Sequence, residues 1–105
     1  MSKVIEVTGD NFNDVVLQSP IPVLVDFYGD YCGPCRLLKP VLAALAEDLG
    51  DKVRIVMVDV AANEGLAKTW KIAAVPTLLV IKDGHEVHRL VGLKDMHYLR
   101  EALGA

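Results

Sequence analysis

Apolar residues along this chain fall into two patterns, which are short continuous runs and stripes at three- and four-residue spacing. The run Val23–Tyr28 is rich in β-branched residues and indicates a strand buried on both faces of a sheet. Val53–Val60 is a second strongly apolar run, and Val4–Val7 is a shorter one. We therefore expect a strand at each of these three runs.

Helical spacing marks the segment that follows the first long run. One apolar stripe recurs every three or four residues there, at Cys35, Leu38, Leu42, Leu45 and Leu49. Gly50 suits the C-terminal cap of this helix. Pro40 lies inside it and should bend it, because proline removes one backbone donor.

Three further helices are expected. Asp10 is a candidate N-cap for the first, which lies between the two N-terminal strands. Asn63 is a candidate N-cap for a short helix through Trp70, and Asp95–Leu103 places its apolar residues on one stripe.

A hairpin is predicted before the last helix. Thr77–Ile81 and Glu86–Val91 flank an Asp83-Gly84 pair, which favours a type I′ turn. The alternation of strands and helices predicts an α/β protein with a mostly parallel central sheet, helices on both faces and a final antiparallel hairpin. Because no linker or repeat interrupts residues 1–105, we expect a single domain.

Composition and charge narrow the class of protein. The chain of 105 residues is 52% apolar, which suffices for a core without disulfide staples or a metal. Its net charge of −3, without a basic block, argues against a nucleic-acid partner. No apolar run approaches the ~20 residues that span a bilayer, and the N-terminus shows no signal-peptide pattern. We therefore expect a soluble, cytoplasmic protein without a membrane partner.

The chemistry is concentrated in residues 31–36, which contain both cysteines. Cys32 should lie at a helix N-terminus, where free N–H groups and the helix dipole lower the pKa of its thiol. As a thiolate it would attack a substrate disulfide, and the more buried Cys35 would resolve the mixed disulfide. The cycle ends with a Cys32–Cys35 disulfide and a reduced substrate. Gly33 and Pro34 shape this tight loop.

Two other uses of such closely spaced cysteines remain open. An inert disulfide would constrain little of the unfolded chain, because the loop is so small. A structural zinc would need two more ligands, for which His85 and His88 are the candidates, although hairpin histidines beside charged residues are more often exposed. A cytosolic pair at this spacing is more often catalytic or metal-binding than a scaffold. We expect the redox role, with no metal and no cofactor.

At this point the chain resembles the thioredoxin family over nearly its whole length. The resemblance rests on four motifs in the family's order and approximate spacing: Val25-Asp26-Phe27-Tyr28, Tyr31-Cys32-Gly33-Pro34-Cys35, Val75-Pro76-Thr77 and Val91-Gly92. It implies the thioredoxin fold, with a central mixed five-stranded sheet flanked by four helices and a cis bond before Pro76. It also implies a protein disulfide reductase, a monomeric dithiol electron carrier that is recharged by a thioredoxin reductase and acts on disulfide-containing client proteins.

The resemblance assigns roles to residues around the cysteines. The backbone of Val75, next to Pro76, would pair with an extended stretch of substrate. Tyr31, Ala74 and Gly92 would border a shallow apolar groove that receives this substrate.

Asp26 interrupts the apolar run of its strand and should therefore be buried, which raises its pKa. The resemblance makes it the proton donor or acceptor near Cys35. Family members commonly carry a lysine on a nearby strand where this chain has Met57. We expect Asp26 to lack a cationic partner unless Lys39 or Lys52 reaches it; an outward-pointing Asp26 is the alternative.

Two tyrosines depart from the family pattern. Tyr28 and Tyr31 stand where bacterial thioredoxins commonly have tryptophan, which changes the recognition surface but keeps an apolar body with a polar tip. Two other functions stay open: an oxidase or isomerase of folding proteins, and a binding subunit that uses the groove without redox turnover. The Gly33-Pro34 pair resembles the reducing members of the family.

Overall fold

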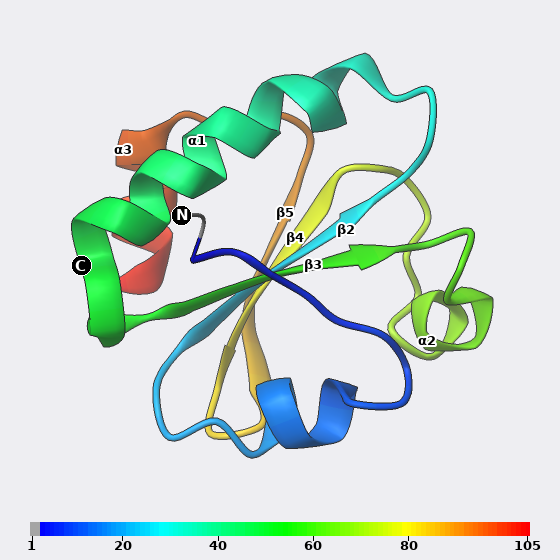
Figure 1. Cartoon of the computed structure of the whole chain (residues 1–105), viewed down its shortest axis with the longest axis horizontal. Helices are drawn as coiled ribbons and strands as arrows, with labels where there is room; N and C mark the ends of the chain where they lie inside the picture. Colours follow the sequence, from blue (N-terminus) through cyan, green and yellow to red (C-terminus); the bar gives the residue numbers. More distant parts are fainter. Residues whose placement is uncertain (1–2) are drawn as a thin grey trace.

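The computed structural model describes residues 3–105, and a five-stranded sheet runs through its middle with helices on both faces (Figure 1). The strand order is β1-β3-β2-β4-β5. The strands are β1 Ile5–Glu6, β2 Val23–Tyr28, β3 Arg54–Asp59, β4 Thr77–Lys82 and β5 His85–Val91. β1, β3 and β2 are parallel, whereas β4 runs antiparallel to both β2 and β5. The sheet is therefore mixed, and its antiparallel part begins one strand pair earlier than the hairpin alone predicts.

The helical elements divide between the two faces of the sheet (Figure 1). They are η1 Asn13–Leu17, α1 Gly33–Leu49, η2 Gly50–Lys52, α2 Glu64–Thr69 and α3 Met96–Leu103. α1 and α3 cover one face over a buried cluster that includes Leu24, Leu38, Leu42, Leu45, Ile55, Leu78 and Leu99. η1 and α2 cover the other face over Val16, Val25, Phe27, Val58 and Leu79. Because the three-residue η2 directly continues α1, residues 3–105 form four helices beside a mixed sheet, which is the fold that the thioredoxin resemblance implies.

α1 forms as its pattern predicts. All five residues of the predicted apolar stripe are buried, and the helix continues through Pro40. Gly50 follows it with a left-handed φ of 54°, a conformation that costs glycine least. The last helix is capped by the Asp95 side chain, which accepts from the Tyr98 N–H at 2.9 Å.

The first helical element differs from its prediction. η1 begins after Phe12, and no side chain within residues 3–105 caps it. Asp10 lies one turn earlier, in a loop closed by Asn11, whose Oδ1 accepts from the Thr8 N–H at 2.8 Å. The prediction that Asp10 is the N-cap was therefore wrong, because Asp10 belongs to this local turn and the helix begins later.

Asn63 precedes α2 as predicted, but its side chain caps no helical N–H. Its amide instead donates to the Asp59 carbonyl at 2.9 Å, and its Oδ1 accepts from the Gly9 N–H at 3.0 Å. Asn63 therefore joins the loop before η1 to the end of β3.

The β4–β5 hairpin turns at Asp83 and Gly84, with φ of 52° and 78°. Two consecutive positive φ values are those of the predicted type I′ turn. β5 then contains a bulge, because Val80 pairs with His88 while Ile81 pairs with Glu86, which leaves Val87 as an extra residue.

Candidate redox site

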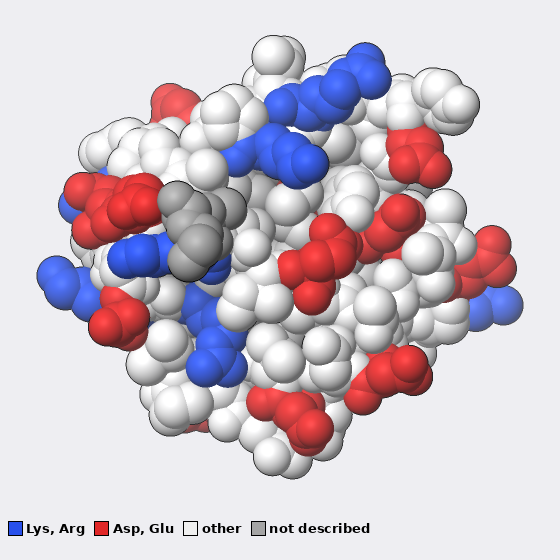
Figure 2. All heavy atoms as spheres, viewed as in Figure 1, with Lys and Arg blue, Asp and Glu red and all other residues white. Residues whose placement is uncertain are grey.

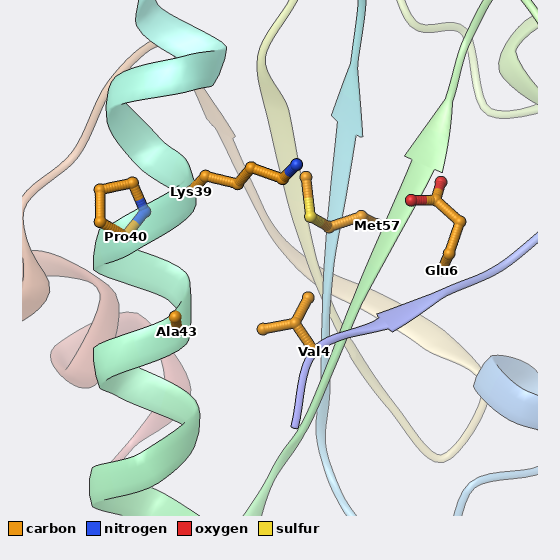
Figure 3. A pocket seen from close by; sticks show the side chains of 6 residues that line it. All are labelled: Val4, Glu6, Lys39, Pro40, Ala43 and Met57. Carbon is orange, nitrogen blue, oxygen red and sulfur yellow. The ribbon is translucent and has the colours of Figure 1, made fainter. Parts of the chain in front are cut away.

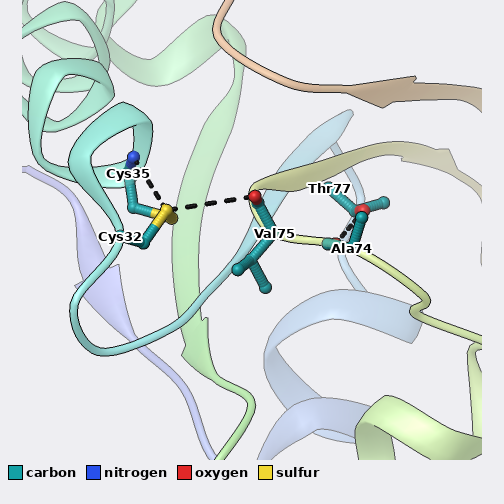
Figure 4. The surroundings of a disulfide bond; sticks show 5 residues. All are labelled: Cys32, Cys35, Ala74, Val75 and Thr77. Carbon is teal, nitrogen blue, oxygen red and sulfur yellow. Dashed lines mark hydrogen bonds between the residues drawn. A yellow bond between two sulfur atoms is a disulfide. The ribbon is translucent and has the colours of Figure 1, made fainter.

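The two cysteines lie at the start of α1, shortly after the end of β2. Cys32 is the N-cap of α1 and is joined to Cys35 by a disulfide, so the structure represents the oxidised form (Figure 4). The Cys35 N–H donates to Cys32 Sγ at 3.1 Å. In the reduced form the same N–H and the helix N-terminus would stabilise a thiolate on Cys32. Cys32 is half-buried and Cys35 is only 4% exposed, as the motif predicts.

The Val75–Pro76 bond is cis, as the resemblance implies, and it faces the cysteines (Figure 4). The carbonyl oxygen of Val75 lies 3.9 Å from Cys32 Sγ. On either side of Val75 the chain is fixed, because the Thr77 hydroxyl donates to the Ala74 carbonyl at 2.6 Å and the Gly92 N–H donates to the Pro76 carbonyl at 2.9 Å. Within residues 3–105, no hydrogen bond occupies the N–H of Val75. We call residues 74–76 the ledge.

A small hollow and several exposed apolar side chains surround the disulfide. A hollow of about 200 Å³ beside the disulfide is lined by Tyr31 but by neither Ala74 nor Gly92. Tyr31 is 99% exposed. Next to Gly92, the side chains of Val91 and Leu93 are also exposed. The sequence reasoning missed these two, although apolar residues flanking a glycine at a strand end could have signalled them.

Asp26 is fully buried on the face of the sheet that α1 covers, in register with Met57 on β3 and Leu78 on β4. Neither of its carboxyl oxygens has a hydrogen-bond partner among the described residues. Burial, and to a lesser extent the negative charge of Glu6, raises the pKa of Asp26 to about 7. The expectation of a buried Asp26 is confirmed, and the outward-pointing alternative was wrong.

Glu6 is a part of the site that the sequence reasoning did not find. It is in register with Met57, as is Asp26 from the other side, so the three form a row across β1, β3 and β2. The Tyr28 hydroxyl donates to Glu6 Oε2 at 2.9 Å. Burial and this hydrogen bond raise the pKa of Tyr28 well above its ordinary value. We call Glu6, Met57 and Asp26 the acidic row.

Within residues 3–105, no lysine or arginine forms an ion pair with Asp26 or Glu6 of the acidic row. The ion pairs that residues 3–105 do form lie elsewhere, on β5, within α3 and between α3 and α1. Lys39 extends from α1 toward the side chain of Met57, and Glu6 lies beyond Met57 (Figure 3). These three residues line a cavity of about 390 Å³ on the outer side of the row. Lys39 therefore reaches the neighbourhood of Met57 without pairing with Asp26, and Lys52 lies at the far end of α1, in η2.

The remaining candidates for chemistry lie apart from the disulfide. His85 and His88 belong to β5 and are exposed. Residues 3–105 contain no group of three or more His, Cys, Asp or Glu side chains placed to hold a metal ion. Across the same part of the chain, no helix is both long and apolar enough to cross a membrane. Figure 2 shows basic side chains over the N-terminal part of α1, and acidic ones over its C-terminal part and over the strands beside it.

The family model described as thioredoxin matches residues 3–105. Thioredoxin 1 of Synechococcus elongatus is 42% identical over 92 residues, which are 88% of this chain and 86% of the relative. The thioredoxin of Mycolicibacterium smegmatis is 42% identical over 95 residues, with 89% and 85% covered, and that of Haemophilus influenzae is 40% identical over 92 residues, with 88% and 86% covered. Because the family model and these relatives match nearly all of a chain that presents a Cys-x-x-Cys disulfide at a helix N-terminus, this protein belongs to the thioredoxin family and is a dithiol reductase of disulfide bonds.

Proposed function

We propose that Cys32 is the attacking nucleophile and Cys35 the resolving thiol when this protein reduces a disulfide in a client protein. The Cys32 thiolate attacks one sulfur of the client disulfide, which forms a mixed disulfide and releases the first client thiolate. Cys35 then attacks Cys32 Sγ, which forms the Cys32–Cys35 disulfide and releases the second client thiolate. Two electrons pass from the protein's dithiol to the client.

The difference in exposure of the two sulfurs carries this assignment. Cys35 is only 4% exposed, whereas Cys32 is half-buried at the helix N-terminus and receives the Cys35 N–H at 3.1 Å. A client sulfur can reach Cys32 first, and the donor that would stabilise its thiolate is already in place.

Asp26 is proposed to take the proton that Cys35 loses when it attacks. With a pKa of about 7, its carboxyl group can both accept and release a proton near neutral pH, which is the condition for efficient general acid–base catalysis. Asp26 and Cys35 both belong to the layer between the sheet and α1, because Asp26 faces this helix and Cys35 lies on its buried stripe.

The ledge is proposed to bind the client chain. An extended segment can pair with the unoccupied N–H of Val75 and with its carbonyl, as one strand pairs with another. Tyr31, Ala74 and Gly92 would contact client side chains, together with the exposed Val91.

We further propose that residues 1–105 act as a single, monomeric domain that carries electrons from a thioredoxin reductase in the cytoplasm. A reductase of disulfides needs a supply of electrons after each turnover, and a reducing compartment keeps such dithiols reduced. The net charge of −3 gives no reason to expect a nucleic-acid or anionic-membrane partner.

Reduction of insulin disulfides with dithiothreitol as the electron source tests this function. The wild-type protein should accelerate the reaction, and the Cys32→Ser variant should not. Retained acceleration by Cys32→Ser would contradict the proposal and favour a binding module without redox turnover.

A further inference from the structure

Arg89 on β5 joins that strand to the loop leading to the ledge. Its Nη2 donates to the Trp70 carbonyl at 2.8 Å, and its Nη1 donates to the Lys71 carbonyl at 3.3 Å. Glu86 holds the other edge of the guanidinium, accepting from Nε at 2.9 Å and from Nη2 at 2.7 Å. The side chain of Arg89 is thereby engaged on two sides although 32% of it is exposed.

The bulge in β5 makes this arrangement possible. Side chains three residues apart on a regular strand point to opposite faces of the sheet. Because Val87 is the extra residue of the bulge, Arg89 pairs with Leu79 and Glu86 pairs with Ile81. Leu79 and Ile81 both face the layer of η1 and α2, so Glu86 and Arg89 stand on the same face.

The loop that Arg89 contacts connects α2 to the ledge. Lys71 within it has a left-handed φ of 56°, a conformation that non-glycine residues seldom adopt. At the far end of the loop, the Thr77 hydroxyl fixes the Ala74 carbonyl at 2.6 Å. Arg89 therefore fixes the first residues of the segment 70–74 and Thr77 fixes the last.

We infer that Glu86 and Arg89, which we call the Arg89 brace, are positioning residues that set where the Val75 backbone lies relative to Cys32 and so determine reactivity toward extended protein disulfides. The inference rests on the proposed pairing of Val75 with the client chain. A small disulfide that does not pair with Val75 would not depend on the brace.

The chemistry of the brace differs from that of an ordinary surface ion pair, which contributes little. Here a charged donor reaches two backbone carbonyls, and hydrogen bonds with an ionised partner are the stronger kind. The hydrogen bonds from Arg89 also hold the pKa of Glu86 below its usual range. Only the planar fork of arginine can serve Glu86 and both carbonyls together, so we expect Arg89→Lys to rescue little.

The test compares the rates at which the reduced protein, residues 1–105, reduces two different disulfide substrates. The Arg89→Gln variant should lose about tenfold in the rate constant for insulin disulfides, less than the roughly hundredfold loss that a full 1 Å misplacement can cause. Its rate constant with the small disulfide 5,5′-dithiobis(2-nitrobenzoic acid) should stay within about twofold of wild type. Arg89→Lys should behave like Arg89→Gln, and Glu86→Gln should show the same selectivity with a smaller loss.

Arg100→Gln is the matched control, since Arg100 pairs with Asp48 on the other side of the sheet. It should leave both rate constants unchanged. The ¹⁵N order parameter of Val75 should fall in Arg89→Gln, which would locate the effect at the ledge. Should Arg89→Gln not fold, Glu86→Gln gives the same comparison.

Equal losses with both substrates, or no loss with insulin, would overturn the role of the brace. The proposed function fails separately, if wild-type protein reduces neither substrate or if Cys32→Ser still accelerates insulin reduction.

Discussion

Residues 32–35, which we call the cysteine turn, and the acidic row are neighbours in the fold but are built in opposite ways. The turn consists of consecutive residues, and its key contact, from the Cys35 N–H to Cys32 Sγ, spans three positions in the chain. The acidic row takes Glu6, Met57 and Asp26 from three different strands. Cys32 at the start of the turn is half-buried, whereas Asp26 is fully buried.

The two regions therefore control different properties of the protein. A helix N-terminus can be supplied by local sequence, so the turn sets the nucleophile. A carboxyl group holds its proton at neutral pH only when many residues exclude water from it, so the whole sheet sets the proton affinity of Asp26. We therefore expect changes in the turn to alter exchange chemistry and changes in the row to alter stability and its dependence on pH.

The largest effect is expected from the cysteines. Cys32→Ser should lower the rate of insulin reduction by at least about a thousandfold, since it removes the nucleophile. Cys35→Ser should also lose turnover, yet form one equivalent of mixed disulfide with a client, because Cys32 can still attack. Mass spectrometry of the trapped complex identifies the attacking sulfur, and a client attached to the remaining cysteine of Cys32→Ser at the same rate would contradict the assignment.

Asp26→Asn should act mainly on stability. The folded protein holds the Asp26 proton up to a pH of about 7, whereas the unfolded chain releases it near 3.8. The native state therefore binds more protons between these values, and stability falls as pH rises through this window. At about 1.4 kcal/mol for each pKa unit, the loss at pH 8 is about 4 kcal/mol.

The asparagine variant cannot ionise and should avoid this loss. We expect it to be more stable than wild type by about 2 to 4 kcal/mol at pH 8 and nearly equal at pH 4, measured by urea unfolding. Its disulfide exchange should slow by about tenfold, because the proton acceptor for Cys35 is gone. Equal stability of the two proteins at pH 8 would show that Asp26 is not a buried, unpaired carboxyl group.

Met57→Lys should lower the pKa of Asp26 and so weaken the dependence of stability on pH. A cation placed between Glu6 and Asp26 favours the ionised carboxylate, so the pKa of Asp26 should fall from about 7 to about 6. The stability loss between pH 4 and pH 8 should shrink accordingly. Met57→Leu is the matched control and should leave the titration in place; identical titrations for the lysine and leucine variants would mean that position 57 does not act on Asp26.

Tyr28→Phe should have the smallest effect, a slight decrease in the free energy of unfolding. It removes the hydroxyl that donates to Glu6 at 2.9 Å, and a partly exposed hydrogen bond of this kind contributes about 0.5 to 1 kcal/mol. Tyr31→Phe, at a side chain that is 99% exposed, serves as the control and should cost less. A loss of more than about 2 kcal/mol in the free energy of unfolding of Tyr28→Phe would show that this hydrogen bond stabilises the protein far more than an ordinary partly exposed one.

The features that could be predicted from sequence are those with local causes. The strand before the motif, the apolar stripe of α1 and the Asp83-Gly84 turn each follow from the spacing or identity of adjacent residues. The burial of Asp26 was also predictable, because it interrupts a continuous apolar run. The first cap was mistaken because the Asn11 side chain closes a competing turn ahead of η1.

The remaining features depend on pairing between distant segments. Glu6 joins the site only because β1, a strand of two residues, pairs with β3 in one particular register. Glu86 stands beside Arg89 on one face of β5 because Val87 is the extra residue of a bulge. Neither the register of so short a strand nor the position of a bulge can be read from one sequence, since both are settled by packing across the sheet.

The most direct test of the contrast between turn and row is a titration of the Asp26 side-chain carboxyl carbon by ¹³C NMR in the oxidised protein, with Asp26→Asn used to assign the signal. We expect a midpoint at a pH of about 7, set by burial and by the charge of Glu6. A midpoint near 3.8, the ordinary value for aspartate, would contradict both the buried proton and its proposed transfer from Cys35.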